Sequence, residues 1–126
     1  MKVIPVLGTV VLIGAIFQVV FGFQVAGGWE TLLWVHIIFG IVGLGLVVVL
    51  AAVAFRAKVA TIYSKITMTI LTLVVLAQVV LGFQVMAGAE ALVTSHEMTG
   101  FLVVVLSLVV GGITFLTAKR RTRSVA

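Results

Sequence analysis

The chain has 126 residues, of which 63% are hydrophobic and 9% are charged, and its mean hydropathy is +1.45. A soluble domain of this length has too much surface for its volume to bury so much apolar material, so we predict a membrane protein. The sequence has no cysteine, which excludes disulfide bonds, iron–sulfur clusters and a thiolate nucleophile. The length fits a single membrane domain, residues 1–126.

Four stretches, in chain order, are long and apolar enough to cross a bilayer, which takes about 20 residues per helix. They cover approximately residues 3–26, 32–55, 66–86 and 92–116. Short turns join the first stretch to the second and the third to the fourth, and such turns make consecutive helices antiparallel neighbours. The sequence therefore predicts an all-α fold, an integral membrane four-helix bundle.

The charged residues separate along this topology. The acidic residues lie at or near the two short turns, and they are Glu30, Glu90 and Glu97. The basic residues flank the opposite ends of the helices, and they are Lys2, Arg56, Lys58, Lys65, Lys119, Arg120, Arg121 and Arg123. Because basic residues mark the cytoplasmic side, we expect a multi-pass protein of the cell membrane with both termini in the cytoplasm. This topology accounts for the net charge of +5 without nucleic-acid binding.

The chain also contains an internal repeat with an offset of sixty residues. Residues 18–36 read QVVFGFQVAGGWETLLWVH and residues 78–96 read QVVLGFQVMAGAEALVTSH, so eleven of nineteen positions are identical. We expect repeat one over about 3–58 and repeat two over about 62–118. Two helices per repeat predict a pseudo-two-fold axis along the membrane normal, as in other membrane folds with parallel repeats.

The two histidines of the chain, His36 and His96, occupy equivalent positions of the repeat. Each lies seven residues after the short turn, which places it roughly 10 Å inside the outer end of its helix. An ionisable side chain at that depth is by default a functional-site candidate, although a buried histidine also serves as a hydrogen-bonded packing residue. A matched pair favours a shared ligand between the two rings.

Two glycines lie one turn deeper on the faces that carry the histidines, at Gly40 and Gly100. Glycine there leaves room beside each imidazole, or allows two helices to pack closely. Room beside two imidazoles favours a flat, bulky group such as haem, with axial nitrogens from both sides. A bare zinc or copper ion would need more donors, and Glu97 is turned about 100° away from the adjoining His96.

The glutamines Gln18 and Gln78 are also duplicated, and they share helical faces with Gly22 and Gly82 respectively. We expect these faces to look into the bundle, where an amide would bind a histidine or a cofactor edge, or would join two helices. The predicted metal ligands are thus His36 and His96. The predicted cofactor-binding residues are His36, His96, Gly40, Gly100, Gln18, Gln78, Gly22 and Gly82.

Two segments, QVVLGFQVMAGAEALVTSHEMTGFLVVVLSLV and WVHIIFGIVGLGLVVVLAAVAFR, resemble helices of one half of the haem A synthase family. The resemblance implies a four-helix bundle with haem ligands on its second and fourth helices, here His36 and His96. Leu33 and Ile37 stand where the family's helix-2 motif has glutamate and arginine, and the family's loop cysteines are missing. The resemblance therefore implies the haem-binding scaffold rather than haem hydroxylation.

Two imidazoles fill both axial positions of a haem and leave none for oxygen. The residues thus predict a b-type cytochrome that binds one haem b per chain near the outer face and transfers electrons. Its partners would be a quinol, an outer-side redox protein or another membrane subunit, within a homo-oligomer or a larger membrane complex. The alternatives are a haem-modifying enzyme of the haem A synthase type, a chlorophyll-binding subunit, and a structural membrane subunit without cofactor.

Overall fold

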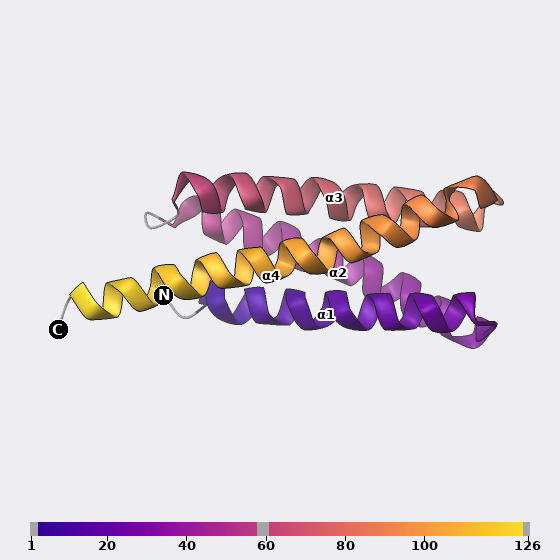
Figure 1. Cartoon of the computed structure of the whole chain (residues 1–126), viewed down its shortest axis with the longest axis horizontal. Coiled ribbons are helices and arrows are strands. Elements are labelled where there is room, and N and C mark those ends of the chain that lie inside the picture. Colours follow the sequence, from indigo (N-terminus) through magenta and orange to yellow (C-terminus); the bar gives the residue numbers. More distant parts are fainter. Residues whose placement is uncertain (1–2, 58–60, 125–126) are drawn as a thin grey trace.

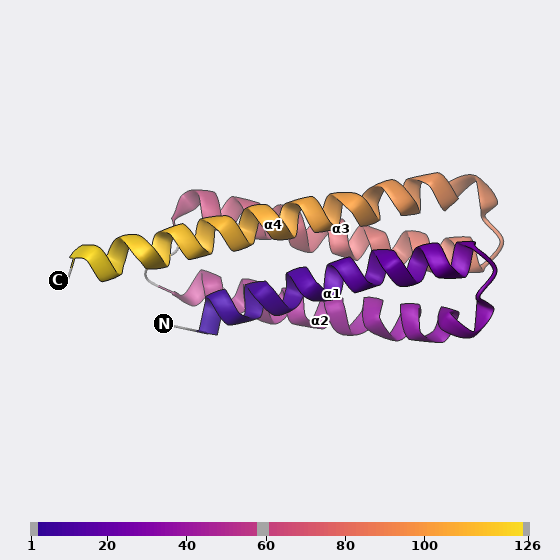
Figure 2. The same cartoon turned by 60° about the horizontal axis from the view of Figure 1, so that its bottom comes forward.

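The computed structural model describes residues 3–57 and 61–124, with side chains described as far as residue 116. Four long helices follow one another along this part of the chain, and they are α1 (Val3–Ala26), α2 (Leu33–Arg56), α3 (Ile62–Met86) and α4 (Val93–Ser124). Two single turns of 3-10 helix, η1 (Glu30–Leu32) and η2 (Glu90–Leu92), lead into α2 and α4. The helices form one bundle without a strand in the described ranges (Figures 1 and 2), which confirms the all-α four-helix prediction.

Each helix packs against two neighbours, and the pairs in contact are α1 with α2, α2 with α3, α3 with α4, and α4 with α1. The histidine-bearing helices α2 and α4 therefore lie diagonally across the bundle. The turns η1 and η2 lie at one end, while the end of α2, the start of α3, the start of α1 and the end of α4 lie at the other (Figure 1). The pseudo-two-fold relation between the two halves stays a prediction.

Two helix boundaries differ from the hydropathy prediction. Helix α3 begins at Ile62, before the apolar stretch, because the Thr61 side chain caps it by accepting a hydrogen bond from the Ser64 amide at 3.2 Å. Helix α4 continues to Ser124, since lysine and arginine favour helix although they leave the hydrocarbon. Lys2 and Lys58 lie outside the described residues, as do the side chains of Lys119, Arg120, Arg121 and Arg123.

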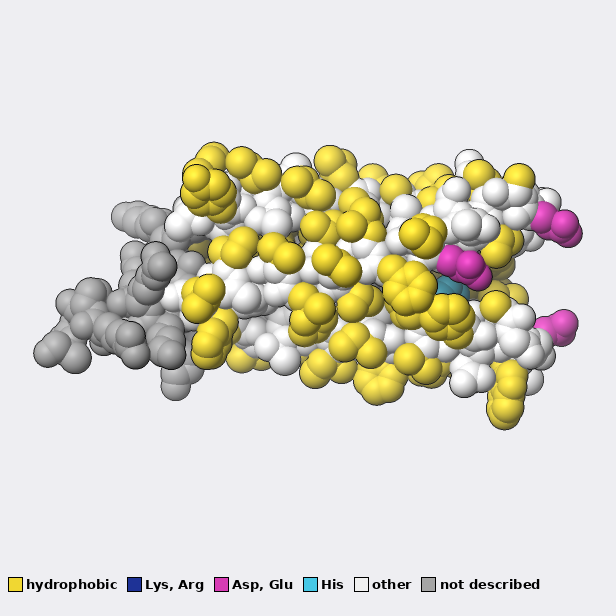
Figure 3. Space-filling model, in the orientation of Figure 1, with side chains coloured by type: hydrophobic (Ala, Val, Ile, Leu, Met, Phe, Trp, Pro, Cys, Tyr) yellow, Lys and Arg dark blue, Asp and Glu magenta, His cyan; other side chains and the backbone are white. Residues whose placement is uncertain are grey.

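All four helices are long and apolar enough to cross a membrane. The bundle buries at most 17% of the most apolar window of any of them. Helices that are hydrophobic all round and stay uncovered need lipid as their solvent. Hydrophobic side chains accordingly cover the visible face of the molecule in Figure 3. The chain is a multi-pass membrane protein whose helices contact the bilayer.

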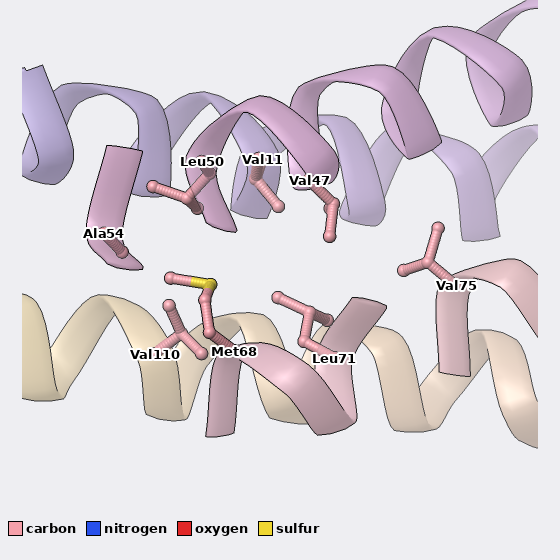
Figure 4. Packing of buried hydrophobic residues seen from close by; sticks show 8 residues of the cluster. All are labelled: Val11, Val47, Leu50, Ala54, Met68, Leu71, Val75 and Val110. Atoms are coloured by element: carbon pink, nitrogen blue, oxygen red, sulfur yellow. The ribbon is translucent and has the colours of Figure 1, made fainter. Parts of the chain in front are cut away.

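The tightly packed core lies in the half of the bundle nearer the α2–α3 connection. Its residues are Val11, Val47, Leu50, Ala54, Met68, Leu71, Val75 and Val110, shown in Figure 4. Leu50, Met68 and Leu71 have 0% exposed surface, so large side chains from α2 and α3 fill this half completely. The close packing here leaves the other half of the bundle as the place where a cavity can form.

The turns between paired helices have the same backbone form. Gly28 has a φ of 96° and Gly88 a φ of 95°, a left-handed conformation that glycine adopts without steric cost. The amide of Trp29 donates to the Gln24 carbonyl at 3.0 Å, and that of Gly28 donates to the Val25 carbonyl at 3.0 Å. These two bonds make a Schellman motif that ends α1. The same two bonds recur sixty residues later at the end of α3, so both turns deliver the next helix in the same way.

Candidate functional site in the bundle interior

A cavity of about 350 Å³ occupies the bundle half that holds the η turns, within the volume range typical of ligand pockets. Most of its lining residues are aliphatic, aromatic or glycine. All of the predicted site residues line it, namely His36, His96, Gly40, Gly100, Gln18, Gln78, Gly22 and Gly82. The structure thus brings together, from all four helices, side chains that are up to 82 positions apart in the sequence.

The two histidine rings meet across the diagonal of the bundle. Each is the fourth residue of its helix, directly after an η turn, which places the two rings at corresponding depths. The ring centroids of His36 and His96 lie 6.0 Å apart, with an angle of 85° between the ring planes. This close approach joins α2 and α4 at a level where their backbones do not touch.

The His36 ring is oriented by the backbone of α1. Its Nδ1 lies 3.1 Å from the Gln18 carbonyl oxygen, and because a carbonyl can only accept, Nδ1 carries the proton. In the neutral ring Nε2 is then the unprotonated nitrogen, which is able to bind a metal. The Gln18 side-chain nitrogen lies 3.4 Å from this Nε2 and donates to the His36 carbonyl at 2.8 Å.

The surroundings of His96 differ in detail. Nδ1 of His96 is buried without a hydrogen-bond partner. The Thr99 hydroxyl donates to Oε1 of Gln78, whereas Phe39 stands at the equivalent place in the first half and Oε1 of Gln18 is buried without a partner. Among the described residues three buried side-chain atoms lack a partner, and two of them belong to this cavity.

Two glycines allow the histidine rings to lie close against a neighbouring helix. A Cβ atom on Gly22 would stand 3.1 Å from Cε1 of His36, and one on Gly82 would stand 3.0 Å from Cε1 of His96. Room beside the imidazoles therefore comes from Gly22 and Gly82 rather than, as the sequence suggested, from the glycines one turn deeper.

Gly40 and Gly100 instead make room for the glutamines. A Cβ atom on Gly40 would lie 3.0 Å from Nε2 of Gln18, and one on Gly100 would lie 3.0 Å from Nε2 of Gln78. The two pairs of glycines thus form two layers, one against the histidines and one against the glutamines.

Three features of the cavity were not predicted from the sequence. Thr99 orders the Gln78 amide, and the Phe23 and Phe101 rings pair across α1 and α4 with their centroids 5.6 Å apart. Glu97 lines the cavity, although we expected it to turn away from His96. A pattern of repeated residues cannot reveal it, because Ile37 is its equivalent in the first half.

The donor set of this cavity is two imidazoles. No group of three or more histidine, cysteine, aspartate or glutamate side chains comes together in the part of the chain that the structure describes. A bare zinc or copper ion would need such a group.

The fold and this cavity define the class of the protein, which is an integral membrane four-helix bundle with a paired-histidine cavity in its interior. Comparison of the chain with models of known families, with curated protein sequences and with solved structures finds no match.

Proposed function

We propose that the chain is a membrane b-type cytochrome that binds one haem b between His36 and His96 and transfers electrons. The observation that carries this proposal is the pair of imidazoles, 6.0 Å apart between centroids, in an apolar cavity inside a membrane bundle. Two imidazole nitrogens that bind one metal at about 2 Å each would hold their ring centroids about 6 Å apart. The observed separation supports a metal shared between the rings.

The side chains around the rings support a haem in particular. A haem supplies four equatorial nitrogens and a one-electron redox centre when bound, so two imidazoles complete its coordination. Phe23, Phe39, Phe83 and Phe101 line the cavity together with aliphatic side chains and would surround the macrocycle. The hydrogen bond from His36 Nδ1 to a backbone carbonyl leaves Nε2 as the ligand and raises its basicity. The Gln18 amide would have to turn away from Nε2 and give up its hydrogen bond to the His36 carbonyl, while its Oε1 has no partner to lose.

Electron transfer is the function that these residues favour over haem modification. Two imidazoles leave no axial position for oxygen, and Leu33 and Ile37, which line the cavity, supply no acid or base at these two positions. We regard the scaffold as similar to one half of the haem A synthase family with the hydroxylation chemistry absent.

The position of the cavity determines which partners can reach it. We propose that the η-turn end faces outward across the cell membrane and that both termini are cytoplasmic, because the basic residues flank the other end. The haem would then lie in the outer half of the bilayer. A quinol in the membrane or an outer-side redox protein would exchange electrons with it, within a homo-oligomer or a larger membrane complex.

The identity of the cofactor tests the function directly. Purified protein is expected to contain one haem b per chain, with a six-coordinate low-spin absorption spectrum that reduces and reoxidises reversibly. Co-expression with a source of haem O, followed by extraction and mass analysis, should recover unmodified haem. Accumulation of haem A or its alcohol intermediate, dependent on His36 and His96, would establish the enzyme instead. A chlorophyll spectrum or a colourless protein would also overturn the proposal.

The proposed orientation has its own test. Thr31 and Ala91 are exposed residues of η1 and η2, and Ala57 lies at the end of α2. Cysteines placed at Thr31 and Ala91 are expected to react with a membrane-impermeant thiol reagent in intact cells, whereas one at Ala57 should react only after lysis. The chain has no cysteine of its own, so each variant reports a single site. The reverse labelling pattern would place the cavity on the cytoplasmic side.

A further inference from the structure

Glu97 differs from the other two acidic residues in its place on the bundle. Glu30 and Glu90 belong to the η turns, whereas Glu97 lies in α4, directly after His96. It lies seven residues past Glu90, roughly 10 Å along the chain axis toward the membrane interior. Figure 3 shows acidic side chains (magenta) at the end of the bundle and also further along it, beside a histidine (cyan).

Glu97 also marks a point where the cavity reaches the lipid. Glu97, Phe23 and Phe101 all line the cavity, yet all three are exposed, the two phenylalanines by 50% and 45%. Phe23 belongs to α1 and the other two belong to α4, and the paired rings of Phe23 and Phe101 contact each other. The cavity therefore opens sideways between α1 and α4, at the level of the histidines.

A carboxylate in this position needs a hydrogen-bond donor. Charged groups inside a bilayer are costly, and those that occur mark functional sites by default. The basic residues of the sequence flank the opposite helix ends, so none of those described lies at the depth of Glu97. Its carboxylate oxygens are therefore acceptors at the cavity mouth.

The other half of the chain shows that packing does not require this carboxylate. The equivalent positions to Glu97 and Phe101 are Ile37 and Ile41, which line the cavity beside Phe83. An isoleucine therefore packs at the position in α2 that corresponds to Glu97 in α4. Phe83 of α3 and Ile41 of α2 are likewise exposed, by 50% and 51%, so the carboxylate distinguishes the α1–α4 opening from this side of the cavity.

We propose that the opening between α1 and α4 binds the ring of a lipid-soluble hydroquinone, with Glu97 accepting a hydrogen bond from a ring hydroxyl. A hydroquinone has three properties that match the residues and the position of this opening. Its aromatic ring suits the Phe23 and Phe101 pair, its apolar tail remains in the lipid, and its hydroxyls donate to a carboxylate. The inference is one of binding, and any oxidation of the bound ring would rest on the proposed function.

Binding is measured by titration calorimetry on the purified protein in lipid nanodiscs, with empty nanodiscs as the blank. The probes are a decyl-tailed benzohydroquinone and the corresponding quinone, which has acceptors but no hydroxyl donor. We expect the unmodified protein to bind the hydroquinone more tightly than the quinone. Glu97→Ile, which copies Ile37, should weaken hydroquinone binding at least about tenfold, because a hydrogen bond to a charged acceptor is lost.

Glu97→Gln supplies a sharper comparison. An amide both donates and accepts, so this variant should lose the preference for hydroquinone over quinone. The matched control Glu90→Gln changes an acidic residue of η2 and should leave both affinities unchanged. If Glu97→Ile is not recovered as a helical protein, the nearly isosteric Glu97→Gln decides alone.

Two results would overturn the inference. One is that the unmodified protein does not bind the hydroquinone, and the other is that Glu97→Gln and Glu97→Ile both bind it as tightly as the unmodified protein does. The haem spectrum of the same samples separates failure of the hydroquinone site from failure of the proposed function. Hydroquinone binding through Glu97 in a protein without haem would refute the cytochrome and leave the binding site standing. A normal haem spectrum without hydroquinone binding would refute the binding site and leave the cytochrome standing. The electron donor would then be an outer-side redox protein.

Discussion

Replacing either histidine by alanine is expected to remove the low-spin haem spectrum of the purified protein. Each of His36 and His96 would supply one axial ligand, and the remaining ring cannot fill both positions. Loss of partners that merely support a ligand lowers metal binding by about 10- to 100-fold, so loss of a ligand should lower haem content at least about tenfold. The double variant should contain no haem above background.

Two controls separate ligation from a structural role. Thr94→Ala changes an exposed residue in the same turn of α4 and should keep the full haem content. Added imidazole should restore the low-spin spectrum of the single alanine variants, because the free ring enters the space that the side chain left. A double alanine variant with an unchanged spectrum would show that the rings are packing residues and not ligands.

Enlarging the glycines that contact the histidine rings is expected to disrupt the site almost as strongly. In Gly22→Val or Gly82→Val, the Cβ atom alone would stand 3.1 Å or 3.0 Å from a ring carbon, and the branched methyl groups would overlap the ring. Overpacking of this kind costs about 1–3 kcal/mol and displaces the ring from its position. We expect haem content to fall together with the denaturant midpoint.

The matched control is Gly45→Val on α2. A Cβ atom on Gly45 meets nothing within 4 Å, and the residue is exposed, so a larger side chain extends into lipid. This variant should keep both haem content and stability. Equal losses in Gly45→Val and Gly22→Val would mean that the glycines matter for helix flexibility and not for space beside the rings.

Hydropathy predicted the four helices well because membrane spanning depends on local composition. A stretch of apolar residues must satisfy its backbone internally, and a helix does so without reference to the rest of the chain. The two errors concern helix ends that polar residues determine. The Thr61 cap starts α3 before the apolar stretch, and α4 continues into its polar last turns.

The repeat in the sequence identified the residues of the cavity but not their contacts. Identical residues sixty positions apart marked a set of eight residues that all line one cavity: His36, His96, Gln18, Gln78, Gly22, Gly82, Gly40 and Gly100. Which glycine contacts which side chain depends on the rotation of neighbouring helices, and the sequence does not contain that angle. For this reason the space beside His36 was assigned to Gly40, whereas Gly22 provides it.

What the sequence by itself determined is the set of properties that follow from composition and spacing: the membrane environment, the number of helices and the equivalence of His36 and His96. The tertiary structure alone decided how the diagonal helices bring the two rings within 6.0 Å of each other, and that Glu97 reaches the cavity mouth. The physical reason is that the hydrophobic pattern of a membrane helix does not show which of its faces points into the bundle, since apolar side chains suit both the bundle interior and the bilayer.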